Sequence, residues 1–225
     1  MVEPRTASDF LSTQRGGGLF TEAVNQRLGA HLAAFAHRRG LAPTSLTLAN
    51  LALGITGSVL VIATTPWAGP IAAVLWQFAY CLDCADGQLA RATGRASAAG
   101  ARVDILCDVA VQISLVAAVA ATASAHVAGL PAWLGPLFAG TWMVNLVTSL
   151  LAGGPAGGSL VPSRSWPVRV VKLVRDYGAI VLVCGVVIAF APRWTGWLMA
   201  ALCIVNGGFL AAAIAQAAQA SRYRR

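Results

Sequence analysis

Four of the eight acidic residues of this chain lie within or at the ends of two long apolar segments, where a carboxylate is costly unless it faces a partner, a cavity or an ion. The first pair is three residues apart and the second pair is four apart, so each pair falls on one face of a helix. The sequence around Gly94 predicts a short turn that joins the two helices as an antiparallel hairpin, which lets the acidic faces converge. The four residues are Asp83, Asp86, Asp104 and Asp108.

Carboxylates that converge in a low-dielectric site repel one another unless cations neutralise them. Oxygen-only ligation favours magnesium, manganese or calcium over zinc. Two such ions bridged by shared carboxylates can clamp a diphosphate and stabilise its leaving phosphate. Gly87 and Gly100 leave room for a ligand or for a close approach of helices, and Arg91 offers a planar group suited to phosphate. These residues predict a site for two divalent ions and a pyrophosphate.

Other interpretations of the acidic hairpin stay open. The aspartates could form intramembrane salt bridges with Arg91, Arg95 and Arg102, an arrangement that does not require the glycines. They could also line the pathway of a non-enzymatic membrane transporter, a function that gives no reason for the pair Ala90-Arg91.

The overall composition indicates a membrane protein. Of the 225 residues, 57% are hydrophobic and only 11% are charged, whereas soluble domains carry about 25% charged residues. The mean hydropathy is +0.70. Attraction to anionic lipid headgroups explains the net charge of +8, so membrane lipids and no nucleic acid are the expected partners.

Six apolar segments can supply the spans of an all-α bundle, since about 20 apolar residues cross one bilayer as a helix. Glycine- and proline-rich breaks separate these segments. We therefore expect an integral membrane protein whose residues 41–225 form one domain of six transmembrane helices. The expected spans are 44–64, 70–90, 98–125, 131–152, 170–191 and 194–218.

Residues 1–40 form a separate cytoplasmic or interfacial segment. From Gly18 onward, bulky apolar residues recur near helical spacing against polar ones, which predicts an amphipathic helix in the membrane interface. A soluble helix that packs on the rest of the protein is the alternative. The apolar residues of this stripe are Leu19, Phe20, Val24, Leu28, Leu32 and Phe35.

The distribution of basic residues orients the chain. With six spans, all of the 16 Lys and Arg residues except Arg193 fall on one side of the membrane. The positive-inside rule makes that side cytoplasmic. We expect a multi-pass protein of the inner (cytoplasmic) membrane, with both termini and the active site on the cytoplasmic face.

The spacing of the hairpin residues resembles, at every fixed position, the signature of the CDP-alcohol phosphatidyltransferases. The interfacial N-terminal helix, the six-helix plan and the opening of the first span from Pro43 to Thr47 are also similar to that family. The signature reads Asp83-x2-Asp86-Gly87-x2-Ala90-Arg91-x8-Gly100-x3-Asp104-x3-Asp108.

The resemblance implies a phosphotransferase that uses two Mg²⁺ ions, with Mn²⁺ as an alternative. It implies that Asp83, Asp86 and Asp104 hold the first ion. Asp83, Asp104 and Asp108 would hold the second, and Asp108 would be the general base for the acceptor hydroxyl. In the implied reaction an alcohol attacks the β-phosphorus of a CDP-alcohol, which yields a phosphodiester and CMP.

By the same resemblance, several residues contact the CDP-alcohol. The expected donor is CDP-diacylglycerol and the expected acceptor is a small alcohol, which makes the product a phospholipid. A soluble CDP-polyol donor and an inactive member of the family are alternatives. The implied contacts are Thr44, Ser45, Leu46, Thr47, Gly87, Arg91 and Ser97.

The signature does not specify the acceptor. Val109 follows Asp108 at a position where members that use inositol phosphate commonly carry arginine, which argues against an inositol-phosphate acceptor. Four basic residues could bind an acceptor phosphate, or could serve only to orient the fifth span. The resemblance further implies a homodimer. The four basic residues are Arg164, Arg169, Lys172 and Arg175.

Overall fold

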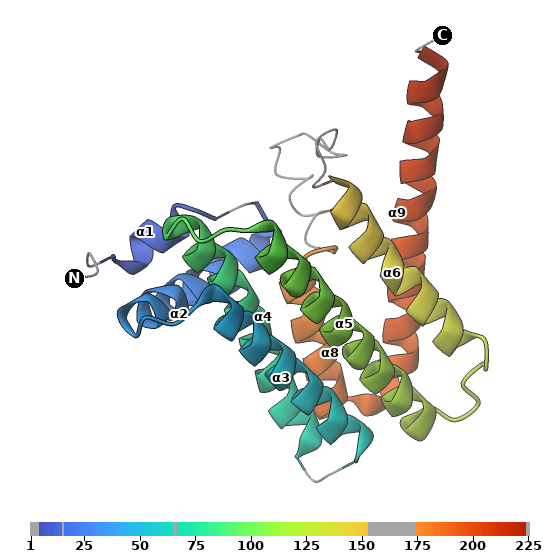
Figure 1. Cartoon of the computed structure of the whole chain (residues 1–225). Coiled ribbons are helices and arrows are strands. Elements are labelled where there is room, and N and C mark those ends of the chain that lie inside the picture. The colour runs from blue at the N-terminus through green and yellow to red at the C-terminus, as the bar shows by residue number, and fades with distance from the viewer. Residues whose placement is uncertain (1–4, 15, 65–66, 153–173, 224–225) are drawn as a thin grey trace.

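The computed structural model describes residues 5–14, 16–64, 67–152 and 174–223, and these ranges contain helices and short connections but no strand (Figure 1). The expectation of an all-α protein is confirmed. Among the elements, η1 is a short π-helix and η2 a 3₁₀ turn. The elements are α1 (Ala7–Leu11), η1 (Thr21–Asn25), α2 (Gln26–Arg38), α3 (Pro43–Ile62), α4 (Ala68–Ala92), α5 (Ala98–His126), α6 (Leu134–Ala152), α8 (Tyr177–Phe190), η2 (Pro192–Trp194) and α9 (Thr195–Tyr223).

Four stretches are long and apolar enough to cross a membrane: α3, α4, α5 and Pro192–Ala215, which joins η2 to most of α9. Two shorter apolar helices, Leu134–Val144 within α6 and the 14-residue α8, occupy the places of the expected fourth and fifth spans. At 1.5 Å per residue α8 is about 21 Å long, less than the roughly 30 Å of the hydrocarbon layer. The membrane-protein architecture is confirmed, while the number of six spans stays a prediction.

The helices α3, α4 and α5 form the centre of the bundle, with α8 packed on α4 and α6 packed on α9 (Figure 1). Small residues bring them close together. A Cβ on Gly185 of α8 would lie only 2.7 Å from the Cβ of Ala73 in α4, and Gly54 of α3 leaves similar room for Val111 of α5. Because lipid is as apolar as the helix surfaces, close van der Waals contact rather than apolar burial drives such packing. The glycines therefore set the spacing of the helices around the acidic hairpin.

Capping hydrogen bonds and one glycine form the turn between α4 and α5. The amide of Arg95 donates to the carbonyl of Ala90 at 2.9 Å, the longer-range hydrogen bond of a Schellman C-cap. Gly94 adopts φ +69° in this cap, a conformation that glycine reaches without a steric penalty. The Ser97 hydroxyl then accepts a hydrogen bond from the Gly100 amide at 3.0 Å and caps α5. The predicted antiparallel hairpin is present.

The N-terminal helices lie across the end of the bundle where α4 ends and α5 begins (Figure 1). Small side chains of α2, among them the buried Ala30 and Ala33, pack α2 on the core beside α4. Leu28 and Phe35 of the expected apolar stripe stay 51% and 46% exposed. The amphipathic helix is present, and its alanines with Leu32 pack on the protein, whereas Leu28 and Phe35 lie on its exposed face.

A methyl group at Gly185 should push α8 away from α4. We expect Gly185→Ala to lower the free energy of unfolding by about 1–3 kcal/mol, the usual penalty of overpacking, although alanine has the higher helix propensity. Gly208→Ala in α9 is the matched control, because a Cβ there meets nothing within 4 Å. Thermal unfolding in one detergent compares the variants with the wild type. Equal destabilisation by both substitutions would contradict the close packing of α4 and α8.

Candidate active site

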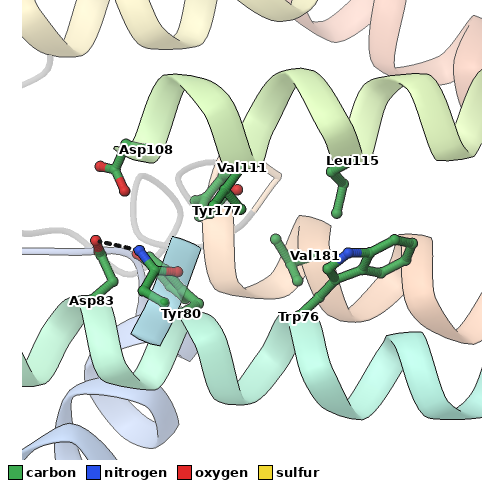
Figure 2. A pocket seen from close by; sticks show the side chains of 9 residues that line it. Trp76, Tyr80, Asp83, Asp108, Val111, Leu115, Tyr177 and Val181 are labelled. Atoms are coloured by element: carbon green, nitrogen blue, oxygen red, sulfur yellow. Dashed lines mark hydrogen bonds between the residues drawn. The ribbon is translucent and has the colours of Figure 1, made fainter. Parts of the chain in front are cut away.

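Three of the four hairpin aspartates gather between α4 and α5. One carboxylate oxygen from each of Asp83, Asp104 and Asp108 lies within 4.8 Å of the other two. Asp83 comes from α4, and the other two come from successive turns of α5. Figure 2 shows Asp83 and Asp108 on opposite sides of the space between the two helices. The helical hairpin thus holds three carboxylates of like charge close together, as a carboxylate cluster.

Asp86 occupies a different position from this cluster. Its side chain is only 4% exposed and accepts a hydrogen bond from the hydroxyl of Thr47 in α3. Thr47 is equally buried. The fourth aspartate therefore bonds to a residue that the sequence also predicts as part of the site, and its carboxylate is oriented by α3.

The donor atoms of the cluster suit a hard divalent cation. All of them are carboxylate oxygens, the ligands that magnesium and calcium prefer. Oδ1 of Asp104 is buried without a hydrogen-bond partner, whereas buried polar atoms are nearly always paired. Asn50 of α3 donates to Oδ1 of Asp83 at 3.4 Å and orients that carboxylate (Figure 2). These residues fit the metal ions that the resemblance implies.

Arg91 lies near the end of α4, with its guanidinium close to Gly87. A Cβ at Gly87 would lie 2.8 Å from Nη1 of Arg91, so glycine there provides the space that the guanidinium uses. Nε of Arg91 donates to the carbonyl of Thr13 at 2.8 Å. The N-terminal segment therefore orients the arginine that the sequence predicts as a phosphate contact.

The remaining predicted CDP contacts differ in their exposure. Thr44 and Ser45 are exposed in the first turn of α3, and Ser97 is exposed at the start of α5. Leu46 is 7% exposed and belongs to the apolar core between the N-terminal helices, α3 and α4. The three hydroxyl side chains are accessible to a ligand, whereas the Leu46 side chain is packed inside the protein.

Of the four basic residues near the start of the fifth apolar segment, Arg175 lies within the described residues. Arg164, Arg169 and Lys172 lie outside them. Cζ of Arg175 is 3.3 Å from the ring centroid of Phe209 in α9, a cation–π contact. Arg175 therefore links the segment before α8 to α9.

A small cavity lies beside the carboxylate cluster, between α4, α5 and α8 (Figure 2). Asp83, Asp108 and Asn50 form its polar end. Trp76 lies at the other end, where its indole Nε1 donates to the carbonyl of Gly54 at 3.1 Å. The remaining lining residues are aromatic or aliphatic. They are Tyr80, Val111, Leu115, Tyr177 and Val181.

Several residues of this cavity were missed by the sequence analysis. Asn50 lies three residues after Thr47 in an apolar span, where a polar side chain needs a partner, so its type and position could have marked it. Tyr80 precedes Asp83 by three residues and shares its helix face, which is a weaker signal. Tyr177 carries no local signal, because it is distant from both aspartates in the sequence and reaches them through the packing of α8 on α4.

Comparison with known proteins identifies the family. The model of the CDP-alcohol phosphatidyltransferase family matches residues 40–206, which is most of the chain and includes all four hairpin aspartates. The chain belongs to this family, and the resemblance inferred from the hairpin signature is confirmed. A search of curated proteins finds no match to the chain. Membership supports a membrane phosphotransferase that acts on a CDP-alcohol donor and an alcohol acceptor.

Removing one carboxylate from the cluster should have opposite effects on stability in the absence and in the presence of Mg²⁺. We expect Asp104→Asn to raise the stability of the metal-free protein, because repulsion with Asp83 and Asp108 is relieved. The same substitution should remove most of the stabilisation by Mg²⁺, which for the wild type is about 2.7 kcal/mol at one hundred times the Kd. Thermal unfolding in EDTA and in excess Mg²⁺ measures both changes.

The charge-matched control for this experiment is Asp9→Asn. Asp9 is exposed on α1, where it accepts hydrogen bonds from Thr6, so its substitution should slightly lower the metal-free stability and leave the Mg²⁺ response unchanged. A Mg²⁺ response in Asp104→Asn as large as in the wild type would contradict metal binding at the cluster.

Proposed function

We propose that the chain is a Mg²⁺-dependent phosphatidyltransferase that moves the phosphatidyl group of CDP-diacylglycerol to a small alcohol and releases CMP, in phospholipid biosynthesis. The observation that carries the proposal is the cluster of Asp83, Asp104 and Asp108 in a chain of the CDP-alcohol phosphatidyltransferase family. A lipid donor fits this position, because the cluster lies near the ends of helices that can cross a membrane. The acyl chains of the donor can then stay in the lipid while its pyrophosphate reaches the carboxylates.

The four aspartates would hold two Mg²⁺ ions, which Mn²⁺ could replace. Asp83, Asp86 and Asp104 would hold the first ion, and Asp83, Asp104 and Asp108 the second. The ions would supply positive charge that neutralises the pyrophosphate and stabilises the leaving phosphate. The Thr47 hydroxyl, which donates to Asp86, orients that carboxylate in the way that outer hydrogen bonds orient metal ligands.

Asp108 is the general base of the transfer. It accepts the proton of the acceptor hydroxyl, and the hydroxyl oxygen forms a bond to the β-phosphorus of the donor. The bond between that phosphorus and the bridging oxygen breaks, and its electron pair leaves with CMP. Asp108 also lines the cavity beside the cluster, so an acceptor in this cavity can present its hydroxyl to the base.

The end of the hairpin that carries the turn binds the CDP part of the donor. Arg91 supplies a planar donor group for phosphate oxygens, and the carbonyl of Thr13 holds it in place. The exposed hydroxyls at the starts of α3 and α5 lie at the same end of the bundle. Leu46 contributes its backbone alone, because its side chain is buried. The CDP contacts are Thr44, Ser45, Leu46, Thr47, Gly87, Arg91 and Ser97.

The acceptor subsite opens at the cavity beside Asp108, which has room for about one water molecule and so receives only the hydroxyl of the acceptor. Its walls are aromatic and aliphatic, and the described residues that line it include no basic side chain. Transfer of a charged phosphate against such walls is costly, so the part of the acceptor that enters is uncharged. Position 109 also agrees with this assignment, because it carries valine and not the arginine that would suit inositol phosphate. The substrate class is a small alcohol whose hydroxyl-bearing end carries no charge.

The end of the bundle that carries the site faces the cytoplasm in our proposal. Arg38, Arg39, Arg91 and Arg95 lie in or beside the helix ends there, whereas Arg193 follows α8 at the opposite end. Basic residues concentrate on the cytoplasmic side of membrane proteins. The chain is thus a multi-pass protein of the inner membrane with both termini in the cytoplasm, and it acts as a homodimer, which cross-linking in membranes can test.

Loss of the general base should abolish the reaction. We expect Asp108→Asn to reduce CMP release by more than about 100-fold, the scale of losing one group that stabilises a transition state. The assay combines membranes, Mg²⁺, CDP-diacylglycerol and a panel of small alcohols that differ in size and charge: glycerol, serine, inositol and glycerol phosphate. Near-normal CMP release by Asp108→Asn would contradict the assigned role.

The same assay distinguishes the proposed donor from the alternatives. CMP release from CDP-glycerol but not from CDP-diacylglycerol would identify a soluble CDP-polyol donor. Movement of the CDP-alcohol across vesicle membranes without CMP release would identify a transporter. Asp9→Asn removes an exposed carboxylate far from the cluster in sequence. It should keep the wild-type rate of CMP release, or of transport, with each donor.

A further inference from the structure

A second buried carboxylate, outside the hairpin, joins two helix N-termini. The side chain of Asp176 is 2% exposed and caps α8 by accepting from the Gly178 amide at 3.1 Å. It also accepts from the backbone amides of Phe20 at 2.7 Å and Thr21 at 2.9 Å, and from the Thr21 hydroxyl. Phe20 and Thr21 lie in the first turn of the helix that continues through η1 and α2. One negative charge therefore satisfies free amides of two helices, whose N-termini both attract anions.

Two glycines permit this junction. A Cβ on Gly18 would overlap the side chain of Asp176, and a Cβ on Gly178 would overlap the side-chain oxygen of Asn25. Neither glycine has an unusual backbone conformation, so the requirement is one of space. The N-terminal segment and the start of α8 are thus closely fitted to each other around the carboxylate.

The junction reaches the proposed acceptor subsite through two tyrosines. The Thr21 hydroxyl uses its proton in the bond to Asp176, so the Tyr80 hydroxyl is the donor in the 3.4 Å contact between Tyr80 and Thr21. The ring of Tyr80 meets the ring of Tyr177 edge-on, with centroids 4.9 Å apart. Both rings line the cavity that contains Asp83 and Asp108 (Figure 2). Tyr177 is also the residue directly after Asp176.

We propose that Asp176 is a positioning residue of the acceptor subsite. It holds the N-terminal helix against α8 and thereby fixes Tyr80 and Tyr177 as the wall of the cavity that the acceptor hydroxyl enters. The inference rests on the proposed function, because it needs this cavity to receive the acceptor hydroxyl. Asp176 acts on the affinity for the acceptor and not on the chemical step or on donor binding.

Asp176→Ser separates capping of α8 from attachment of the N-terminal helix. Serine can still cap α8, but its short neutral side chain loses the charge-assisted bonds to Phe20 and Thr21. We expect the KM for the acceptor to rise at least about tenfold, with the KM for CDP-diacylglycerol unchanged. The wild type is first assayed with glycerol, serine, inositol and glycerol phosphate. The alcohol that gives the fastest CMP release is then the acceptor used for the variants. Hydrogen exchange should become faster at Phe20 and Thr21 and stay slow in the first turn of α8.

Thr21→Val is a milder variant that tests the link if Asp176→Ser fails to fold. It removes the hydroxyl between Asp176 and Tyr80 but keeps both backbone amides, so we expect an acceptor KM about three- to tenfold higher, the range of one hydrogen bond. Thr21→Ser restores the hydroxyl and should restore the wild-type KM. Thr122→Val is the control, because Thr122 is another buried threonine whose hydroxyl donates, at 2.9 Å, to Ala118 within α5.

The outcomes separate this inference from the proposed function. A wild type that releases no CMP from any CDP-alcohol would overturn the proposed function, and the inference with it. An active wild type whose acceptor KM is the same in Asp176→Ser and Thr21→Val, with only kcat reduced, would leave the proposed function intact. That result would show that Asp176 only maintains the fold, and the positioning role would be wrong.

Discussion

The repulsion among carboxylates held between two apolar helices is the constraint on which the site depends. Oxygens of the half-buried Asp83, Asp104 and Asp108 lie within 4.8 Å of one another between packed helices, where charge is screened less than in bulk water. The side chains cannot relax apart easily, because the Schellman turn at Gly94 and the close packing of α3 on α5 at Gly54 fix both helices. A rigid cluster of negative charge is a strong binding site for divalent cations, and bound cations in turn attract a pyrophosphate.

The N-terminal segment contacts both parts of the proposed site. The carbonyl of Thr13 holds Arg91 on the proposed donor side, and Phe20 and Thr21 bond to Asp176 on the proposed acceptor side. The same segment leaves bulky apolar residues of α2 exposed for lipid. The N-terminal segment can thus determine the geometry of both proposed substrate subsites.

The residues that follow from local spacing could be predicted from the sequence. The hairpin turn, the shared faces of the aspartates and the space at Gly87 depend only on helical periodicity and on residues close together in the chain. The bond from Thr47 to Asp86 could not be predicted, because it depends on how α3 is rotated against α4. Asp176 and Tyr177 were missed for the same reason, since their roles arise where α8 packs on elements distant in sequence. The burial of the alanine face of α2 could not be predicted either, because it depends on the position of α4.

Anomalous scattering from Mn²⁺ in crystals grown with CDP-diacylglycerol is the most direct measurement of the central claim. The account predicts two anomalous peaks between α4 and α5, each about 2.1 Å from oxygens of Asp83 and Asp104, the distance typical of small hard divalent ions. The pyrophosphate of the donor should contact both peaks. Mn²⁺ bound elsewhere, or a donor pyrophosphate held away from the carboxylates, would contradict the account.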